Sequence, residues 1–424
     1  MMLLRGGRVV DPSQPLDALR DLRIANGVIV EIGEHLAPRE GERVVDVTGA
    51  VVAPGFVDMH VHLREPGYPE KETIATGTEA AVRGGFTAVA CMPNTNPAID
   101  SVDVIDYVMN LARESNRARV YPIAAITVGR KGVQPCDFGA LSRGGAVAFS
   151  DDGNTVMNAR VLRDAALRAL EVDGVFISHC EDEHIKGDAV MNEGIVSRAL
   201  GVPGSPSVAE DIIAGRDLLI GMETGKPWHI AHVSTHGALE QVLHARAHGA
   251  NATCEVTPHH LILTDETVRE RGAAGKVNPP LRTDIDARML RDAVRDGTID
   301  VFATDHAPHT LAEKAGDLRH AAVGFTGLEI AIGAYALAVP DLPMLRFVEL
   351  LSTNPTRILG VPGGTLTVGS PADVTVFADR EWLVDPETFA SKGKTTPFAG
   401  RILPRRAIAT IVGGELKYEL TPKD

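Results

Sequence analysis

Asp58-Met59-His60-Val61-His62-Leu63-Arg64-Glu65-Pro66-Gly67 follows directly on the apolar run of residues 51–57. Side chains two apart on a strand point to the same face, so His60 and His62 can reach one point in space. Two imidazoles that converge at the end of a strand supply half of a zinc site. The stretch therefore predicts a strand with metal ligands at its end, provided that later strands end in ligands as well.

Eight short β-branched runs recur along the middle of the chain, each followed by a segment of helical periodicity. They cover residues 55–62, 88–92, 120–126, 146–150, 175–179, 228–233, 252–256 and 299–304. Strands that alternate with helices build βαβ units and a parallel sheet, and eight such units close a barrel. The competing arrangement is an open, doubly wound sheet, but no glycine-rich phosphate-binding fingerprint follows the first strand. The predicted fold class is α/β, a (β/α)8 TIM-like barrel.

Both ends of the chain carry strand patterns and lack the helical rhythm of the middle. Residues 1–54 include the hairpin signal Asn26-Gly27, and residues 363–424 hold further β-rich runs. Two separate small domains would each struggle to bury a core, whereas chain ends that lie close together can pair. We expect a small composite β-sandwich domain, with residues 1–54 as its N-terminal part and 363–424 as its C-terminal part, beside a hydrolase barrel at 55–362.

Composition restricts the partners and the compartment. The chain has 424 residues, 44% of them hydrophobic and 23% charged, which is typical of a globular protein that is not embedded in a membrane. A net charge of -14 disfavours nucleic acid and anionic membranes as general partners, although an anionic small substrate remains compatible. Four scattered cysteines suggest buried thiols rather than a disulfide framework, and no signal peptide or long apolar run is present. We expect a cytoplasmic protein.

Potential ligands stand at the ends of five predicted strands, where barrel enzymes carry their chemistry. The first strand ends in the His60 and His62 pair, and the others contribute Asp151 or Asp152, His179, His232 and Asp305. Each residue alone has an ordinary interpretation as a surface or satisfied core group. Together at one level of one barrel, they predict a metal centre.

Four histidines and two carboxylates exceed the ligand set of a single zinc ion. The surplus suggests two metals that share a bridging carboxylate and hold a hydroxide between them, which is a nucleophile at neutral pH. Asp305, at the last strand, is placed both to bind a metal and to shuttle the proton that the nucleophile releases.

Five motifs, spread over the length of the chain, give it a resemblance to the dihydroorotases of the amidohydrolase superfamily, in particular the bacterial class I type. They are His60-Val61-His62-Leu63-Arg64-Glu65-Pro66-Gly67, Met92-Pro93-Asn94-Thr95-Asn96-Pro97, Asn278-Pro279-Pro280-Leu281-Arg282, Thr304-Asp305-His306-Ala307-Pro308-His309, and the run from Ser391-Lys392 to Thr396-Pro397-Phe398-Ala399-Gly400. The His-x-His pair alone marks the superfamily. Its Arg-Glu-Pro-Gly extension, with Asp-His-Ala-Pro-His, is specific to dihydroorotases and their near relatives.

The resemblance implies a reversible cyclisation of N-carbamoyl-L-aspartate to L-dihydroorotate in the de novo synthesis of pyrimidines. It implies two Zn²⁺ ions per chain, the second site being partly occupied. His60 and His62 would bind one ion, His179 and His232 the other, and Asp305 would complete the first site and act as general acid and base. The resemblance also implies a set of substrate contacts: His62, Arg64, Asn94, Asn278, His309, Val323 and Gly324.

The bridging ligand departs from the wider superfamily, in which many members use a carboxylated lysine at the end of the fourth strand. Here that position offers Asp151 and Asp152, as in the bacterial subset of dihydroorotases whose bridge is an aspartate. Alternation along a strand lets only one of the two face inward. The family pattern favours Asp152, and Asp151 stays open as the alternative.

Two other functions fit parts of the pattern. Another cyclic-amide hydrolase, of the allantoinase or hydantoinase kind, acts on rings without the attached carboxylate, so the presence of Arg64 and Asn94 argues against it. A non-catalytic scaffold for aspartate transcarbamoylase would lose metal ligands, whereas every ligand position is filled here. An active enzyme could also associate with aspartate transcarbamoylase, and a homodimer is the default oligomer.

Two more segments near the expected site have predicted roles. Residues 310–322 form a polar stretch after the last barrel strand and are a candidate substrate lid, because long loops after barrel strands tend to be functional. His259 and His260 follow the seventh strand, and such a pair more often shapes a loop than binds a metal.

Overall fold

Eight parallel strands form the barrel in the computed structural model, which describes residues 1–421. Their order around the barrel follows the chain: β6 (Phe56–Val61), β7 (Phe86–Cys91), β8 (Arg119–Ala124), β9 (Ala148–Ser150), β10 (Val175–Ser178), β13 (Trp228–Ile230), β14 (Ala252–Val256) and β15 (Val301–Phe302). The barrel closes beyond β15, where His306 pairs in parallel with Val61 and its carbonyl accepts the backbone N–H of His62 at 2.8 Å. The predicted (β/α)8 barrel is confirmed.

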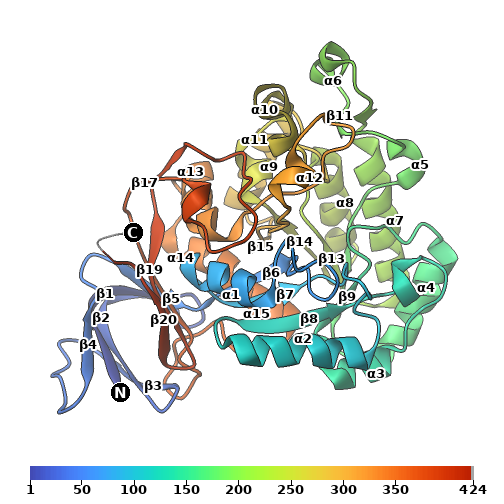
Figure 1. The fold of residues 1–424 in the computed structure, drawn as a ribbon. Coiled ribbons are helices and arrows are strands. Elements are labelled where there is room, and N and C mark those ends of the chain that lie inside the picture. The colour runs from blue at the N-terminus through green and yellow to red at the C-terminus, as the bar shows by residue number, and fades with distance from the viewer. Residues whose placement is uncertain (422–424) are drawn as a thin grey trace.

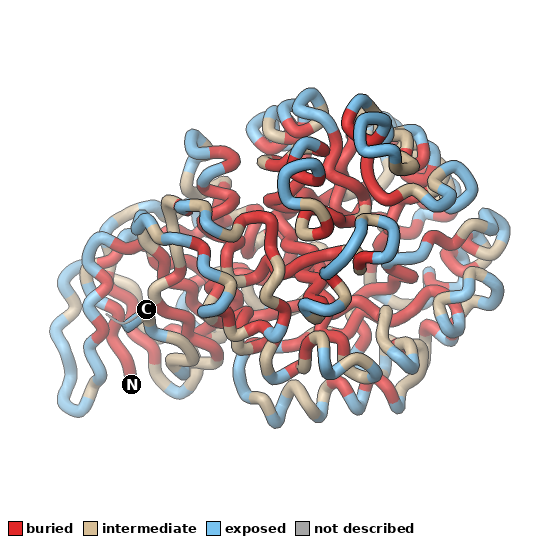
Figure 2. Tube along the Cα trace, turned by 45° about the horizontal axis from the view of Figure 1, so that its top comes forward, coloured by how far each residue is buried: buried red, intermediate tan, exposed pale blue. Residues whose placement is uncertain are grey.

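Alternation along each strand separates two apolar layers. Small and branched side chains such as Val57, Ala90 and Ala231 fill the barrel interior. Larger rings such as Phe176 and Trp228 point outward against the helices. Because both faces of the strands are covered, the barrel is the most continuously buried part of the chain, and exposure is concentrated in peripheral loops (Figure 2).

Helices surround the barrel on its outer side (Figure 1). They are α1 (Ile74–Arg83), α2 (Val102–Ser115), α3 (Phe138–Gly144), α4 (Ala159–Arg168), α7 (Val208–Thr224), α8 (His236–Ala247), α11 (Asp284–Arg295), α13 (Ala331–Ala338), α14 (Met344–Val348) and α15 (Asn354–Leu359). Threonine side chains cap three of them: Thr73 before α1, Thr235 before α8 and Thr283 before α11. Within residues 1–421, none of the helices has the length and apolar character needed to cross a membrane.

Shorter elements lie in the loops that connect strands to helices. They are α5 (Glu183–Lys186), β11 (Met191–Asn192), α6 (Ile195–Leu200), β12 (Gly204–Ser205), α9 (Pro258–Ile262), α10 (Asp265–Arg271) and α12 (Leu311–Lys314). All of them follow β10, β14 or β15, and β10 and β15 also end in predicted ligands.

The two ends of the chain form one mixed sheet at one end of the molecule (Figure 1). It runs in the order β20 (Glu415–Glu419), β19 (Arg406–Val412), β16 (Val374–Ala378), β5 (Val51–Pro54), β1 (Met2–Asp11), β2 (Leu16–Ala25) and β3 (Val28–Gly33), with β4 (Arg43–Asp46) paired to β1. N- and C-terminal parts meet where β5 pairs antiparallel with β16. The predicted composite β domain is confirmed, because neither end forms a sheet of its own.

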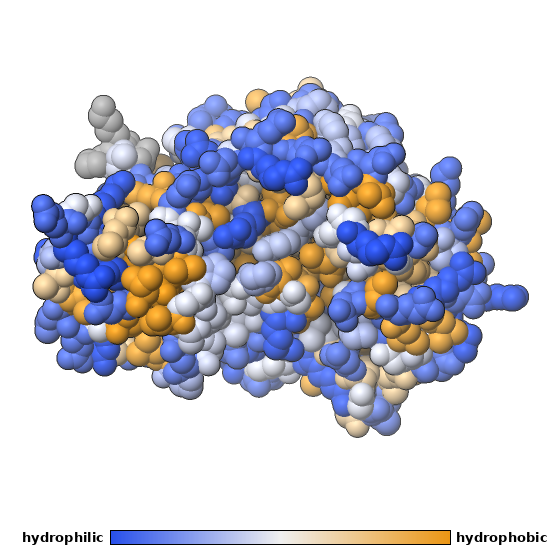
Figure 3. Space-filling view, turned by 90° about the horizontal axis from the view of Figure 1, so that it is seen from below, coloured by the Kyte–Doolittle hydropathy of each residue, from blue (hydrophilic) through white to orange (hydrophobic). Residues whose placement is uncertain are grey.

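A separate apolar cluster supports this sheet. Val9 and Val52 from the N-terminal part pack with Val374 and Ile411 from the C-terminal part, all at most 1% exposed. The hairpin between β2 and β3 turns at Asn26 and Gly27, whose φ angles of 52° and 77° suit a tight turn. On the face seen in Figure 3, apolar side chains gather over this end of the molecule, with charged residues around them.

One part of the C-terminal segment returns to the barrel. Residues 379–405, with β17 (Trp382–Leu383) and β18 (Ile402–Leu403), bring Phe389 and Phe398 into a cluster with Phe325 and Ile330. We propose domain boundaries at 54/55 and 362/363, with residues 379–405 as an excursion from the β domain that buttresses the loop after β15.

Candidate metal and substrate site

Six side chains converge at the carboxyl ends of the barrel strands. His60 and His62 come from the end of β6, and the others follow β9, β10, β13 and β15 in turn: Asp152, His179, His232 and Asp305. All six are buried. The structure thus brings together the six residues that the family resemblance implied as metal ligands, with Asp152 rather than Asp151 at the end of β9.

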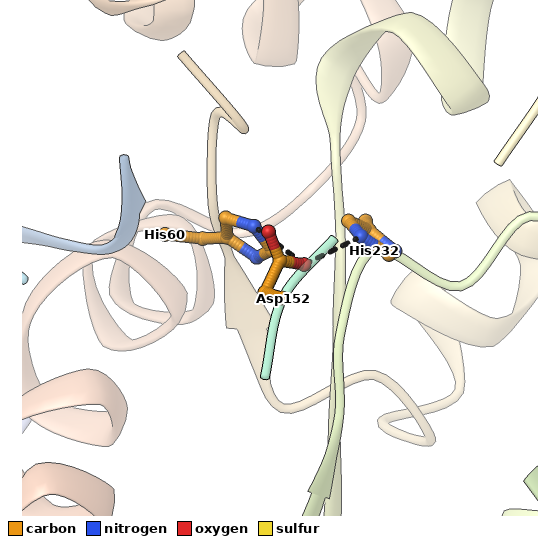
Figure 4. A group of neighbouring side chains, drawn as sticks. All are labelled: His60, Asp152 and His232. Atoms are coloured by element: carbon orange, nitrogen blue, oxygen red, sulfur yellow. Dashed lines mark ion pairs between the residues drawn. The ribbon is translucent and has the colours of Figure 1, made fainter. Parts of the chain in front are cut away.

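Asp152 lies at the middle of this group. Its Oδ1 is 3.5 Å from His60 Nε2, 3.4 Å from His179 Nδ1 and 3.5 Å from His232 Nε2. Its Oδ2 is 3.6 Å from His62 Nε2. Figure 4 shows the carboxylate between His60 and His232, which reach it from opposite sides of the barrel mouth. A carboxylate that faces both pairs of histidines has the geometry of a bridging ligand.

Asp305 joins the pair from β6. Its Oδ1 lies 3.0 Å from His62 Nε2 and 3.6 Å from His60 Nε2. Two overlapping groups of donors therefore exist, one of His60, Asp152 and His232 and one of His60, His62 and Asp305.

Unpaired donor atoms in the site test whether a metal fits these residues. Among residues 1–421, His60 Nε2 and Asp152 Oδ1, which face each other at the centre, are buried without a hydrogen-bond partner. A buried polar atom left unpaired costs about 1–3 kcal/mol, which a cation bound to it would offset. Imidazole nitrogens mixed with carboxylate oxygens are ligands typical of zinc and similar divalent ions. The donor set therefore fits divalent metal.

Asp151 points away from the centre and has a structural environment. Its carboxylate accepts the backbone N–H groups of Ile126 at 2.9 Å and Thr127 at 3.0 Å, and also the Thr127 hydroxyl. Its oxygens are thereby engaged by the loop after β8. Of the two neighbouring aspartates, only Asp152 faces the histidines.

Charge within the site holds its carboxylates ionised. Burial alone would raise the pKa of Asp152, but His60, His179 and His232 around it lower that pKa well below its usual range. The pKa of Asp305 is lowered too, because the hydrogen bond with His62 and the nearby histidines outweigh burial. Both groups are therefore carboxylates near neutral pH, ready to bind a cation or accept a proton.

Two further carboxylates orient the histidine rings, and the sequence interpretation did not identify them. Glu255 Oε1 accepts from His60 Nδ1 at 2.6 Å, which directs His60 Nε2 to the centre. Glu181 Oε2 lies 2.9 Å from His179 Nε2, which leaves Nδ1 for the centre. Despite burial, which raises them, the neighbouring cationic groups lower the pKa values of Glu255 and Glu181 to about 2. Such partners fix ring orientation in metal sites.

A signal for Glu255 was present in the sequence. It interrupts the otherwise uncharged run Ala252-Thr253-Cys254-Glu255-Val256 at an inward position of β14. A charged residue inside a barrel strand needs a buried partner, and the neighbouring ligand strands are where one would be found. Glu181 follows His179 by two residues and carried no comparable signal.

A cavity of about 330 Å³ opens above the six residues. Every predicted substrate-contacting residue lines it: His62, Arg64, Asn94, Asn278, His309, Val323 and Gly324. The cavity therefore joins the candidate metal centre to the groups that the sequence suggested for substrate.

Arg64 makes one side of the cavity strongly attractive to anions. Its guanidinium is buried, donates from Nε to the carbonyl of Pro308 at 3.1 Å, and has no carboxylate at ion-pair distance in the described part of the chain. Burial lowers the pKa of Arg64 to about 10, so the group stays charged at neutral pH. A buried cation without a counter-ion binds a carboxylate strongly, in a two-pronged geometry.

Neutral groups complete that side of the cavity. Asn94 Oδ1 lies 2.8 Å from His62 Nδ1, so the amide nitrogen of Asn94 is free to donate elsewhere. His309 Nε2 lies 2.8 Å from the carbonyl of Val323, and burial beside Arg64 lowers the pKa of His309 to about 3. His309 is thus a neutral imidazole next to a fixed positive charge.

Backbone conformation at the site departs from the ordinary regions. Arg64, His232 and Asp305 have φ angles of 66°, 34° and 48°, in the left-handed region that non-glycine residues seldom adopt. Such residues cluster at functional sites, where the surrounding structure imposes them.

The lid segment and the histidine pair border the site. Lys71 pairs with Glu313 at 2.7 Å and thereby ties residues 310–322 to the loop after β6. His260 contacts Thr257 Oγ1 at 2.8 Å and the carbonyl of Pro279 at 3.0 Å. His259 packs against the ring of Phe325, and neither histidine lines the cavity.

Fold and site together define a cyclic amidohydrolase: a (β/α)8 barrel with a histidine–carboxylate centre under a small cavity. Comparison with known proteins narrows this class. Residues 49–238 match a family described as "Dihydro-orotase-like". A protein from Syntrophus aciditrophicus named dihydroorotase is 45% identical over 422 residues, 99% of each chain. Another from Pelotomaculum thermopropionicum is 47% identical over 419 residues, 98% of each chain. The chain belongs to the dihydroorotase family.

Solved structures with the same fold include two hydantoinases. The L-hydantoinase (dihydropyrimidinase) from Arthrobacter aurescens matches with a TM-score of 0.88 and 24% identity, over 99% of this chain and 96% of that chain. The D-hydantoinase from a Thermus species matches with a TM-score of 0.84 and 22% identity, over 99% and 95%. At these identities the likeness concerns the fold.

Proposed function

We propose that this protein is a dihydroorotase that interconverts N-carbamoyl-L-aspartate and L-dihydroorotate in the de novo synthesis of pyrimidines. The observation that carries the proposal is the buried guanidinium of Arg64, which has no carboxylate at ion-pair distance in the described part of the chain and lines the same cavity as five of the six converging ligands. The substrate needs both, since its ring carries a carboxylate and contains the amide bond to be broken. The full-length relatives support the same activity.

Two Zn²⁺ ions per chain are part of this proposal, with His60, His62 and Asp305 holding one and His179 and His232 the other. Asp152 would bridge them, and the second site would be partly occupied. Bound there, the metal would activate water and polarise the amide carbonyl. The overlapping donor groups and their unpaired buried atoms support this assignment.

The other residues bind and orient the substrate. Arg64 and Asn94 would receive the carboxylate of the ring with three or more N–H groups, assisted by His309. Asn278 and the Val323-Gly324 backbone would contact the ring edge, and His62 would lie against the substrate as well. Asp305 would accept the proton of the attacking water and pass it to the leaving nitrogen, because it is an ionised carboxylate that lies beside His60 and His62 and lines the cavity.

Stripping the protein of metal and adding zinc back tests the proposal. We expect dihydroorotate hydrolysis to vanish on chelation and to return in proportion to bound zinc, up to two equivalents per chain. Binding to the native state should also raise the melting temperature, since zinc at 100 times its Kd adds about 2.7 kcal/mol to the free energy of unfolding. Calorimetric titration, metal analysis and turnover would be measured on the same samples.

A matched pair of histidine variants sharpens this experiment. His179→Asn should bind fewer equivalents of zinc, whereas His244→Asn, on the exposed face of α8, should bind as many as the wild type. If the protein bound zinc but did not turn over dihydroorotate, its substrate would have to be another cyclic amide. If the protein neither bound zinc nor turned over dihydroorotate, the remaining interpretation would be a non-catalytic scaffold for aspartate transcarbamoylase.

The direction of the reaction should depend on pH. Ring closure consumes one proton, because the product has one carboxylate fewer than the substrate. The equilibrium ratio of dihydroorotate to N-carbamoyl-L-aspartate should therefore fall about tenfold for each unit of rising pH near neutrality. We expect faster ring closure at lower pH and faster hydrolysis at higher pH. Initial rates in both directions from pH 6 to 9 measure this, and a shared optimum would refute the proton assignment.

Location and assembly complete the proposal. We place the protein in the cytoplasm, which the four buried, free cysteines support. We expect a homodimer, since two-fold dimers are the commonest oligomers, and association with aspartate transcarbamoylase is a further expectation from the family resemblance. Sedimentation velocity of the protein, alone and mixed with aspartate transcarbamoylase, measures both.

A further inference from the structure

Lys186, the last residue of α5, lies between the candidate metal centre and the substrate cavity. Its ammonium pairs with Glu181 Oε2, the same oxygen that faces His179 Nε2. On its other side the ammonium meets the side-chain amide of Asn278, which lines the cavity. Lys186 itself does not line the cavity, so any influence on a bound ring passes through Asn278.

The chemistry of an ammonium group settles which way the Asn278 amide faces. Lysine only donates hydrogen bonds, so the amide atom 2.6 Å from Lys186 Nζ is the carbonyl oxygen. The amide nitrogen then donates to the carbonyl of Val277 at 3.0 Å. One N–H of Asn278 is left, and the oxygen is already engaged.

We propose that Lys186 is a positioning residue that fixes Asn278 as a hydrogen-bond donor toward the substrate ring. Glu181 holds the ammonium in place, and the ammonium holds the amide oxygen away from the ring. Asn278 then offers an N–H to a ring oxygen and disfavours a ring N–H at the same edge. This inference rests on the proposed function, because it assigns a specificity role within that cavity.

Asn94 shows the same arrangement on the opposite side. Its oxygen faces His62 Nδ1 at 2.8 Å, which leaves its amide nitrogen for the ligand. Both asparagines in the cavity are thus turned by a neighbouring donor. A cavity whose amides and guanidinium all present N–H groups suits a ligand edged with oxygens, as a carboxylated cyclic ureide is.

Nearby lysines do not duplicate this role. Lys276 Nζ donates to the carbonyls of Leu318 and Ala321 at 2.6 and 2.8 Å. Lys314 Nζ donates to the carbonyl of Ala322 at 2.9 Å. Both ammonium groups hold the backbone around the lid segment, so Lys186 is the lysine at the Asn278 side chain.

Lys186→Met and Lys186→Arg, with Lys131→Met as the matched control, test the inference. Lys131 belongs to the loop after β8 and contributes nothing to the cavity lining. Lys186→Met should lower kcat/KM for dihydroorotate by about 5- to 30-fold, mainly through KM, because a binding contact rather than the chemical step is disturbed. Lys186→Arg should recover most of the loss, and Lys131→Met should match the wild type.

A double-mutant cycle with Asn278→Ala separates positioning from a general structural effect. If Lys186 acts through Asn278, the double variant should be no worse than Asn278→Ala alone. The inference would be overturned if the fold-losses in kcat/KM of the two single variants multiplied in the double variant. A Lys186→Met variant with the wild-type KM would overturn it as well. Should Lys186→Met fold poorly, as its melting curve would reveal, the cycle is run with Lys186→Gln. Wild-type protein without turnover would instead count against the proposed function.

Discussion

Asp305→Asn should lower kcat for dihydroorotate hydrolysis by about 10³-fold, within the range of 10²–10⁴ that a positioned acid–base group supplies. Asparagine has nearly the same shape and keeps an oxygen toward His62, but it cannot accept the proton of the attacking water. The hydrogen bond with His62 and the nearby histidines hold the pKa of Asp305 below its usual range, so the group is ionised at neutral pH and has an oxygen free of protons for that step. Steady-state rates in both directions measure the effect, because the same group must return the proton in ring closure.

Asp317→Asn provides the matched control for this change. Asp317 is exposed on residues 310–322, where its carboxylate pairs with His320 at 3.0 Å and accepts the backbone N–H of Arg319 at 2.8 Å. The control should turn over at the wild-type rate, and both variants should be assayed for zinc content. An Asp305→Asn enzyme with full metal content and more than a tenth of the wild-type kcat would remove Asp305 from the proton transfer.

Arg64→Met should lower kcat/KM for dihydroorotate by roughly 10²- to 10⁴-fold, which corresponds to the roughly 3–5 kcal/mol lost when one partner of a buried ion pair is removed. The guanidinium is buried beside the neutral His309, so the substrate carboxylate would be its counter-ion. Methionine fills similar space without the charge. Initial rates over a range of dihydroorotate concentrations give the loss.

A ring without the carboxylate distinguishes binding of that group from a general defect. Wild-type protein should turn over 5,6-dihydrouracil poorly, and Arg64→Met should lose little further activity on it. Arg64→Lys should restore only part of the dihydroorotate activity, since an ammonium cannot match the two-pronged guanidinium contact. Equal losses on both rings would show that Arg64 supports the cavity rather than the carboxylate.

The barrel could be predicted from the sequence because the residue pattern of its strands reflects their burial. Each is buried on both faces and reads as a short apolar run, as β7 and β10 show. Functional residues of such barrels lie at the carboxyl ends of the strands. His179 and His232 could therefore be placed together without knowledge of the side-chain positions. That the two ends share one β domain was predicted because each end alone would bury too little core, and the structure shows that β5 and β16 join them.

What the sequence could not give are contacts between distant loops. Lys186 meets Asn278, and Glu255 meets His60, only because closure of the barrel brings together strands and loops that are not adjacent in the sheet. No local pattern encodes such a pair. The choice between Asp151 and Asp152 also depended on the loop after β8, whose backbone N–H groups donate to the carboxylate of Asp151.

The shared terminal sheet has a consequence for synthesis on the ribosome. β5 ends at Pro54, while its partner β16 begins at Val374, so the N-terminal strands leave the ribosome long before the sheet can be completed. At roughly 5–20 residues per second, the delay is on the order of half a minute. Throughout that time the edge of β5 is open to pairing with other chains. We therefore expect a chain truncated before residue 374 to keep the β5 edge of the terminal sheet unpaired and to aggregate more readily than the full-length chain.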